Sequence, residues 1–345
     1  MKKILAMILA AVMLLTMAAC GASSDVTEAP KANVAETKAA DTAAEETEAA
    51  AETYKIGICQ LVQHDALDAA TQGFKDALTE KLGDAVSFDE QNASGDSANC
   101  ATIVNGFVSD DVDLIMANAT APLQAAASAT ADIPVLGTSV TDYATALEIE
   151  DWTGTVGNNI SGTSDLAPLD QQAAMVNELF PDAETVGLLY CTAEPNSVYQ
   201  CTVIEEYLKG YGYTVEWFGF TDTNDVNAVT QEACDGSDVI YIPTDNTAAA
   251  NTEAIANVVV PAGVPVVAGE EGICTGCGVV TLAIDYYTLG YKTGEMAVKI
   301  LKGEAKVGEM AIQTLTPTKL YNADRWAELG MGDVPADYAA IKTAE

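Results

Sequence analysis

From Tyr54 onward, two patterns alternate along the chain, and this alternation constrains the fold most. Short apolar runs are separated by longer segments in which apolar residues recur at helical spacing. The runs are typical of buried strands and the longer segments of amphipathic helices, so the pattern predicts parallel sheets covered by helices. The expected strands are 55–59, 86–90, 113–117, 134–137, 185–190, 214–218, 239–242, 264–268, 279–284 and 311–315. The expected helices are 65–82, 97–109, 121–130, 167–179, 198–211, 226–233, 247–259 and 287–302.

The pattern is duplicated. Segments 113–139 and 238–270 both consist of a strand, a polar turn, a helix and a second strand marked by proline. Duplication at this scale, in a chain too long for one core, predicts two Rossmann-like α/β lobes that face each other across hinge crossovers. The helix after Asp285 should return to the first lobe, which would otherwise have only four strands. We therefore expect a first lobe of 54–157 plus about 279–305, and a second of 158–278 plus about 306–345.

The N-terminus has the features of an export signal. Lys2 and Lys3 precede an apolar run that is too short to span a bilayer, and Met17-Ala-Ala-Cys20 ends it. These last residues resemble the lipobox of bacterial lipoproteins, which implies a cleaved signal peptide over 1–20 and a diacylated Cys20 that anchors the protein to the cell membrane. Residues 21–53 contain no Leu, Ile, Phe or Trp and should form a disordered acidic tether. The alternative is an ordinary signal with a chance cysteine.

Charge and cysteine content exclude several functions. The net charge of −36 excludes a nucleic-acid partner, which needs a basic face. A single histidine, His64, excludes a metal centre built on several histidines, and we expect neither a metal nor a cofactor. Free buried thiols are expected at Cys59, Cys100, Cys191, Cys201 and Cys234. Cys274 and Cys277 form a CxxC motif, which is either a tight loop with incidental cysteines or a redox or disulfide pair.

Small polar residues follow almost every expected strand, at the sheet edge where parallel α/β proteins bind ligands. The candidate ligand-binding residues of the first half are Gln60, His64, Asn118, Thr120, Thr138, Ser139 and Thr141. Those that follow are Ser164, Asp165, Glu194, Asn196, Ser197, Thr244, Asp245, Asn246, Glu271 and Asp285, the first two near an expected hinge. Each residue alone could be a helix cap. Their recurrence at the same edge of both halves favours a binding site.

The chemistry of this edge suits a zwitterion such as an amino acid. Helix N-termini bind carboxylates without arginine, and Thr138, Ser139 and Thr141 could add hydroxyl donors. Asp285, together with Asp245 or Glu271, could hold an ammonium group. No GxSxG, P-loop or GxGxxG motif follows a strand, and His64 has no evident nucleophile to activate, so an enzyme is not expected.

Several segments together resemble one known family. They are 54–74, Gly137-Thr-Ser-Val-Thr-Asp142, Gly162-Thr-Ser-Asp165, Pro243-Thr-Asp-Asn246, Gly269-Glu-Glu-Gly272 and Ile284-Asp-Tyr-Tyr-Thr-Leu-Gly290. The set is similar to the ABC-transporter substrate-binding lipoproteins associated with tryptophan and tyrosine uptake. The resemblance implies a monomeric type I periplasmic-binding-protein fold that closes around its ligand and delivers it to a permease with a cytoplasmic ATPase. The family commonly has proline where Asp65 stands, but an acidic residue suits the first turn of a helix equally well.

The sequence therefore predicts an extracytoplasmic solute-binding lipoprotein of an ABC importer, with an aromatic or other apolar amino acid as ligand. One alternative keeps the fold but binds a sugar, nucleoside or small peptide; the aromatic content of 6% disfavours the sugar, because sugar sites usually stack rings. A surface adhesin or sensor without transport is another. Trp152, in the less familiar stretch 143–158, could stack on a ligand or simply pack.

Overall fold

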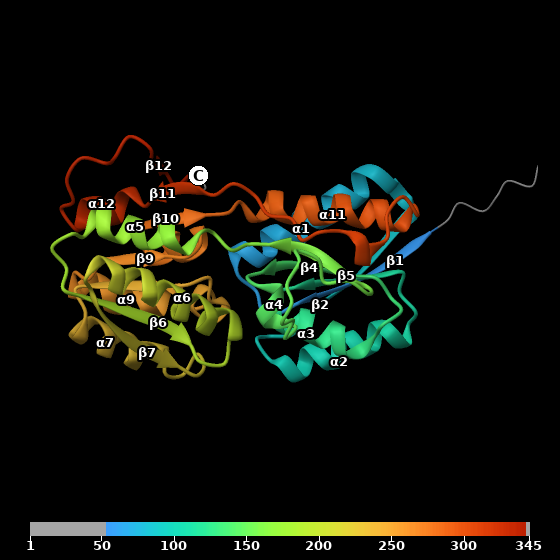
Figure 1. Ribbon diagram of the computed structural model, residues 1–345, viewed down its shortest axis with the longest axis horizontal. Coiled ribbons are helices and arrows are strands. Elements are labelled where there is room, and N and C mark those ends of the chain that lie inside the picture. Colours follow the sequence, from blue (N-terminus) through green and yellow to red (C-terminus); the bar gives the residue numbers. More distant parts are fainter. Residues whose placement is uncertain (1–52, 343–345) are drawn as a thin grey trace, which may run out of the picture. The chain divides into compact units, whose positions relative to one another are not determined.

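Two separate β-sheets organise the part of the chain that the computed structural model describes, residues 53–342 (Figure 1). The signal segment, Cys20 and nearly all of the expected tether lie outside these residues. The first sheet is entirely parallel, in the order β2-β1-β3-β4-β5. Its strands are β1 (Tyr54–Gln60), β2 (Val86–Asn92), β3 (Leu114–Asn118), β4 (Val135–Val140) and β5 (Ile160–Ser164).

Helices cover both faces of this sheet. They are α1 (Asp65–Leu82), α2 (Ser97–Ser109), α3 (Thr120–Ala129), the short α4 (Tyr143–Ala146), α11 (Tyr286–Leu301) and the 3-10 turn η1 (Gly83–Ala85). Neighbouring strand residues pack on opposite faces: Leu114 and Met116 contact the α1–α11 layer, whereas Ile115 and Ala117 contact the α2–α3 layer. A strand that is buried on both faces has a continuous apolar sequence, so the position of such a strand can be predicted from the sequence.

The second sheet repeats this order and extends it. Its order is β12-β11-β10-β9-β8-β6-β7, so β7-β6-β8-β9-β10 corresponds to β2-β1-β3-β4-β5. The strands are β6 (Thr185–Cys191), β7 (Thr214–Phe220), β8 (Val239–Ile242), β9 (Val266–Ala268), β10 (Val280–Ala283), β11 (Thr318–Tyr321) and β12 (Ala339–Ala340). Only β11 is antiparallel to its neighbour β10. The duplicated sequence segments correspond to β3–β4 in one lobe and β8–β9 in the other, which confirms two Rossmann-like lobes.

Three of the four helices expected in the second lobe form close to their predicted positions, the fourth is broken, and two further short helices form where none is predicted. The helices are α5 (Leu169–Leu179), α6 (Pro195–Tyr211), α7 (Val226–Gly236), α8 (Asn246–Ala249), α9 (Thr252–Ala262), α10 (Glu271–Gly276) and α12 (Ala323–Glu328). The 3-10 turn η2 (Val307–Glu309) packs instead against β5 of the first sheet. The single helix expected over 247–259 is broken into α8 and α9. Asn251 stands at the break, where its amide donates to the carbonyl of Thr247 at 2.7 Å and replaces a helical bond.

Two strands lie on the other side of the expected lobe boundaries. β5 pairs with β4 in the first sheet, and β10 pairs with β9 in the second, which corrects the boundaries expected at 158 and 279. Close pairing of β4 and β5 is possible because Gly162 has φ +149° and no Cβ; a Cβ there would lie 2.1 Å from the Gly137 carbonyl oxygen. An apolar run indicates a strand but not its neighbour.

The strand expected over 311–315 is also corrected. Within that run only Gln313 forms an isolated bridge, to Thr163, and the last strands are β11 and β12. Because a single residue is in register with β5, no ladder develops. Ser161 also donates its hydroxyl to the Met310 carbonyl, so the run lies beside the first sheet before the chain continues to β11.

Three segments connect the lobes: one between β5 and α5, one between β10 and α11, and one before β11. The helix after Asp285 returns to the first lobe as expected, since α11 packs along α1 (Figure 1). Glycine makes this close packing possible; a Cβ on Gly290 would lie 1.9 Å from the Ala70 carbonyl oxygen. Within residues 53–342, no helix combines the length and apolar character needed to cross a membrane.

Candidate functional site

A narrow inner cavity of about 10 Å³ lies where strands of both sheets end. Ser139 and Thr141 reach it from the end of β4, and His64 from the turn before α1. Opposite them, Thr244 and Asp245 follow β8. The complete lining is His64, Leu67, Ser139, Thr141, Asp165, Asn196, Thr244, Asp245, Asn246, Ala249, Glu270 and Tyr286. The topology explains the meeting, because the carboxyl ends of parallel strands share one edge.

A larger outer cavity of about 230 Å³ adjoins the inner one. Both are lined by Asn196 and Asn246. The outer cavity combines polar groups with aliphatic side chains, and no aromatic ring lines it; its aliphatic contributors are Leu61, Val62, Ala121, Ala193, Pro195 and Ala250. An apolar ligand group of substantial size can therefore extend from the inner cavity into the outer one.

Direct hydrogen bonds join the lobes at the inner cavity. The hydroxyls of Thr141 and Thr244 lie 3.3 Å apart. His64 Nε2 lies 3.3 Å from Asn246 Oδ1. Behind them the buried Gln200 amide donates to the Thr244 hydroxyl at 2.6 Å and to the Thr141 hydroxyl at 3.4 Å. The two lobes are therefore closed on each other in this conformation.

Two polar atoms of the inner cavity have no hydrogen-bond partner among the described residues. They are the hydroxyl oxygen of Ser139 and Oδ1 of Asp165. Their residues are only 6% and 4% exposed. Leaving a buried polar group unsatisfied costs roughly 1–3 kcal/mol, so such atoms need an explanation. One is a donor and the other a carboxylate oxygen, which is the pair of groups that a zwitterionic ligand would satisfy.

The backbone at this edge of the first lobe is strained. Ser139 has φ +54° and Ala119 has φ +98°, both in the left-handed region that non-glycine residues avoid. Ser139 lies within β4, and Ala119 immediately follows β3. Strain of this kind costs about 1–3 kcal/mol and clusters at binding sites, where it aims a side chain or a backbone group.

Buried carboxylates dominate the electrostatics of the inner cavity. Burial raises the pKa of Asp245 to about 8, with a further contribution from the nearby Glu194 carboxylate. Burial also raises the pKa of Glu270 to about 7, and that of Asp165 above its usual range. No lysine or arginine lines either cavity. The site therefore favours a ligand that brings a positive charge, because a cation would relieve the cost of ionising these groups.

His64 lies at the junction of the two lobes. Burial lowers its pKa, although Asn246 and three carboxylates oppose this effect, so the imidazole favours its neutral form. Its hydrogen bond to Asn246 crosses between the lobes. Within residues 53–342, no group of three or more His, Cys, Asp or Glu side chains is arranged to hold a metal ion.

Many predicted site residues line the inner cavity, namely His64, Ser139, Thr141, Asp165, Asn196, Thr244, Asp245 and Asn246. Glu194 lines the outer cavity, but its two carboxylate oxygens are already used. They accept hydrogen bonds from the backbone amides of Asn246 and Thr247 and from both side chains. Glu194 therefore holds the start of α8 in place and, through it, the partner of His64.

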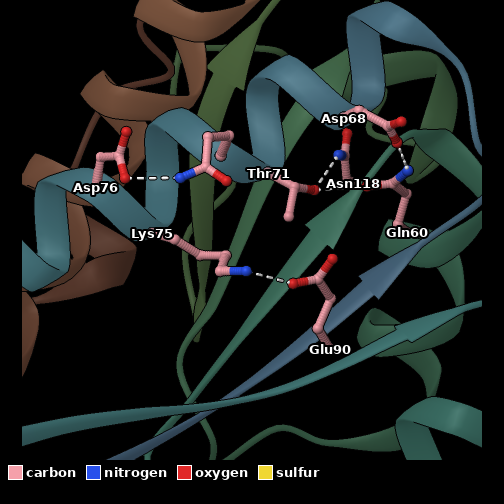
Figure 2. A network of polar contacts seen from close by, with 8 residues as sticks. Gln60, Asp68, Thr71, Lys75, Asp76, Glu90 and Asn118 are labelled. Atoms are coloured by element: carbon pink, nitrogen blue, oxygen red, sulfur yellow. Dashed lines mark hydrogen bonds and ion pairs between the residues drawn. The ribbon is translucent and has the colours of Figure 1, made fainter.

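Gln60 and Asn118 belong instead to a network behind the cavity (Figure 2). The Thr71 hydroxyl donates to Gln60 Oε1 at 2.6 Å, and the Asn118 amide donates to the Thr71 hydroxyl at 3.0 Å. Gln60 also donates to Asp68 Oδ1 at 2.6 Å. The network ties the ends of β1 and β3 to the first turns of α1, the helix that His64 precedes.

The remaining predicted residues line neither cavity; they are Thr120, Thr138, Ser164, Ser197, Glu271 and Asp285. The Thr138 hydroxyl lies 3.2 Å from the Thr163 hydroxyl, and Ser164 donates to the Thr141 carbonyl at 2.8 Å. Asp285 is exposed and caps α11 by accepting from the Thr288 amide at 2.6 Å. Trp152 is 38% exposed and also lies outside both linings.

Four residues of the inner lining were not among the predicted set: Leu67, Ala249, Glu270 and Tyr286. Glu270 is the N-cap of α10 and accepts from the Gly272 amide at 2.6 Å and from the Ile273 amide. The predicted residue is its neighbour Glu271, since the sequence pair alone does not reveal which one faces inward. Tyr286 likewise follows the predicted Asp285. Gln200, one layer behind, had no sequence signal.

The cysteines of the described residues are all free thiols. This confirms the expectation of free buried thiols for Cys59, Cys100, Cys191 and Cys201; Cys234 is free but only half-buried. Cys274 and Cys277 are buried, and burial raises the pKa of Cys277 to about 12. A high pKa leaves little thiolate, so these two cysteines have the character of core residues.

Two matching α/β lobes, closed around a small polar cavity, define a solute-binding protein of the type I periplasmic-binding-protein fold. The profile of the family described as ABC transporter substrate binding protein matches residues 55–331, and the chain belongs to this family, which is extracytoplasmic. A curated relative, the tyrosine-binding protein of Clostridioides difficile strain R20291, is 37% identical over 286 residues, which cover 82% of each chain.

Two solved structures bear on the conformation. A domain from Streptococcus pneumoniae in complex with L-Trp has 31% identity and a TM-score of 0.78, covering 81% of this chain and 96% of the other. The ligand-free, open structure of a Clostridium difficile substrate-binding protein with adhesive properties has 38% identity but a TM-score of 0.64, covering 85% and 100%. The open structure is more similar in sequence and less similar in shape, in agreement with the closed lobes described above.

Proposed function

We propose that this protein captures an aromatic or other apolar amino acid between its lobes and delivers it to the permease of an ABC importer, which a cytoplasmic ATPase drives. The observation that carries the proposal is the pair of unpartnered buried atoms in the inner cavity, the Ser139 hydroxyl and Asp165 Oδ1. One suits the α-carboxylate and the other the α-ammonium of an amino acid.

The carboxylate is assigned to the edge of the first lobe. Ser139 offers its free hydroxyl, and Thr141 offers a second whose only cross-lobe partners lie at 3.3 and 3.4 Å. Hydrogen bonds to a charged group are shorter and stronger than these, so a carboxylate would displace them. Thr138, whose hydroxyl already meets Thr163, supports this edge from behind.

The ammonium is assigned to Asp165, with Glu270 and Asp245 close by in the same lining. All three carboxyls have raised pKa values because of burial, and a bound cation lowers them again. Binding therefore ionises groups that are costly to ionise in the empty site. Asp285 is left with its role as the cap of α11, since its carboxylate is exposed.

The side chain of the ligand is assigned to the outer cavity. Its volume of about 230 Å³ far exceeds the 10 Å³ of the inner cavity, so it is the part of the site with room for a ring. The tyrosine-binding relative and the L-Trp complex support an aromatic ligand. The ligand is bound and released unchanged, without a catalytic residue.

Calorimetric titration of the purified protein with each of the twenty amino acids tests this function. Tyrosine, tryptophan or phenylalanine should bind most tightly, and charged amino acids should not bind. A set of sugars and nucleosides run in parallel covers the alternative ligand class. Absence of heat with every amino acid would refute the ligand assignment.

We further propose that Cys20 carries the lipid that holds the protein, as a monomer, at the outer face of the cell membrane. Membrane fractionation of cells that express the wild type or Cys20→Ser tests this anchor; release of the variant into the medium is expected, and equal membrane retention would contradict it. A surface adhesin is the second candidate function, favoured by the adhesive properties of the Clostridium difficile relative. Adhesion assays with a binding-deficient variant such as Asp165→Asn would separate the two roles.

A further inference from the structure

One hydrogen bond joins the first connection between the lobes to the start of the helix that follows the second connection. Asp165 directly follows β5, in the first connection, and Tyr286 begins α11, directly after the second. The Tyr286 hydroxyl donates to Asp165 Oδ2 at 2.6 Å. Both residues are buried; Tyr286 is 8% exposed and Asp165 is 4% exposed.

The bond also borders the inner cavity, since both residues belong to its lining. The Asp165 carboxylate thus has two different oxygens. Oδ2 is committed to Tyr286, whereas Oδ1 has no partner among the described residues. One carboxylate therefore faces the connection on one side and the ligand space on the other.

The ring of Tyr286 is held by its neighbours. It packs in a cluster with Ala66, Ala70, Ile284 and Leu289, which belong to α1, the second connection and α11. Because the ring is fixed, the hydroxyl is aimed at Asp165 rather than free to rotate away. The neighbouring Tyr287 points elsewhere, since its hydroxyl donates to Asp76 at 2.9 Å and the residue is 42% exposed.

We propose that Tyr286 is a positioning residue for ligand capture. Its hydrogen bond to Asp165 holds the two connections together and orients the free carboxylate oxygen toward the cationic group of the ligand. This inference rests on the proposed amino-acid function. Ligand binding at Oδ1 then stabilises the arrangement of both connections at once, and these connections set the angle between the lobes. A ligand shifts the equilibrium between open and closed lobes only through contacts that differ between these two states. The Asp165 carboxylate, held by Tyr286, supplies one such contact.

The test compares Tyr286→Phe with the matched control Tyr287→Phe, which loses the same kind of hydroxyl contact outside the cavity. Affinity is measured for L-tyrosine and L-tryptophan and for their deamino analogues, 3-(4-hydroxyphenyl)propionate and indole-3-propionate. Tyr286→Phe should lose roughly 10- to 100-fold in affinity for the amino acids, the value of a hydrogen bond to a charged group, and less than about threefold for the analogues. Tyr287→Phe should bind all four as the wild type does. Equal losses for amino acids and analogues would mean a merely structural role and overturn the proposal.

A second readout needs no ligand. Amide hydrogen exchange of the ligand-free proteins should become faster in residues 165–169 and 284–289 together in Tyr286→Phe, and in neither segment in Tyr287→Phe. Unchanged exchange in the two connections would overturn the proposal that the Tyr286–Asp165 bond holds them together, even if amino acids bind. If the wild type bound no amino acid, the proposed function would fall, and the exchange result would still decide whether this bond holds the connections together.

Discussion

The two lobes have the same strand order but present different chemistry at corresponding edges. In the first lobe, the end of β4 brings the neutral hydroxyls of Ser139 and Thr141 to the cavity, with Ser139 on a strained backbone. In the second lobe, the corresponding β8 and β9 lead to Asp245 and Glu270, buried carboxyls with raised pKa values. The duplicated scaffold therefore determines where the site lies. The divergence of β4 from β8 and β9 places hydroxyl donors opposite carboxyl acceptors, and Asp165, which follows β5 of the first sheet, is a further acceptor.

The largest expected effect comes from the carboxylate that lies between the lobes. Asp165→Asn keeps the shape of the side chain but removes its charge, so the bound ammonium would lose its partner in a buried site. Affinity for the amino acid should fall by roughly 100- to 1,000-fold. Calorimetric titration measures the loss. The control is Asp285→Asn on the next connection, an exposed carboxylate for which asparagine is an equally good helix cap. A comparable loss in this control would return the ammonium site to Asp285.

A smaller effect is expected at the donor edge, the end of β4 with Ser139 and Thr141, and it tests the carboxylate assignment. Ser139→Ala removes the unpartnered hydroxyl, and affinity should fall by roughly 10- to 100-fold, as for a hydrogen bond to a charged group. The ligand-free variant should be as stable as the wild type or more stable, because no existing bond is lost. Ser164→Ala is the control, since its hydroxyl donates to the Thr141 carbonyl and lies outside both cavities. Chemical denaturation and titration of both variants give the two quantities; a destabilised Ser139→Ala that binds normally would contradict the assignment.

The smallest effect concerns the acceptor edge and pH. Glu270 titrates near 7 in the folded protein, against an ordinary value of 4.5, so the folded state keeps a proton that the unfolded chain has already released. This contribution to stability is present below about pH 4 and is lost as the pH rises through 7. The free energy of unfolding of the ligand-free protein should therefore fall between about pH 5 and pH 8. Glu270→Gln should flatten the fall by about 1–3 kcal/mol.

The exposed Glu304→Gln serves as the control for this pH profile, because it changes the net charge equally. Thermal unfolding followed across the pH range compares the three proteins. A saturating amino acid should also flatten the wild-type profile, since its ammonium favours the ionised carboxyls. Parallel curves for the wild type and Glu270→Gln would show that the acceptor edge does not titrate in this way.

Most of the elements could be predicted from the sequence because their signals are local. The bounds of α1, α2 and β8 match the expectation to the residue, since apolar periodicity and capping residues lie within each segment. The partners of strands are not local. β5 and β10 changed lobes relative to the expectation, and the run 311–315 formed one bridge in place of a strand.

The candidate site divides in the same way. Polar residues gather at one edge because the strands run in the same direction, and this direction can be inferred from the sequence. Which of them face the ligand depends on the orientation of each side chain after packing. Gln60 and Asn118 turn toward α1, and Glu270 rather than Glu271 turns inward.

By itself, the sequence determined two duplicated α/β lobes, their helix and strand positions, and a polar edge without arginine or histidine clusters, because each depends on composition or on contacts along one segment. Only the tertiary structure decided which strands belong to which lobe, that Tyr286 joins Asp165 across two connections, and that the hydroxyl of Ser139 and Oδ1 of Asp165 are left without partners. These features depend on residues far apart in the chain, such as positions 165 and 286, whose packing no local pattern encodes.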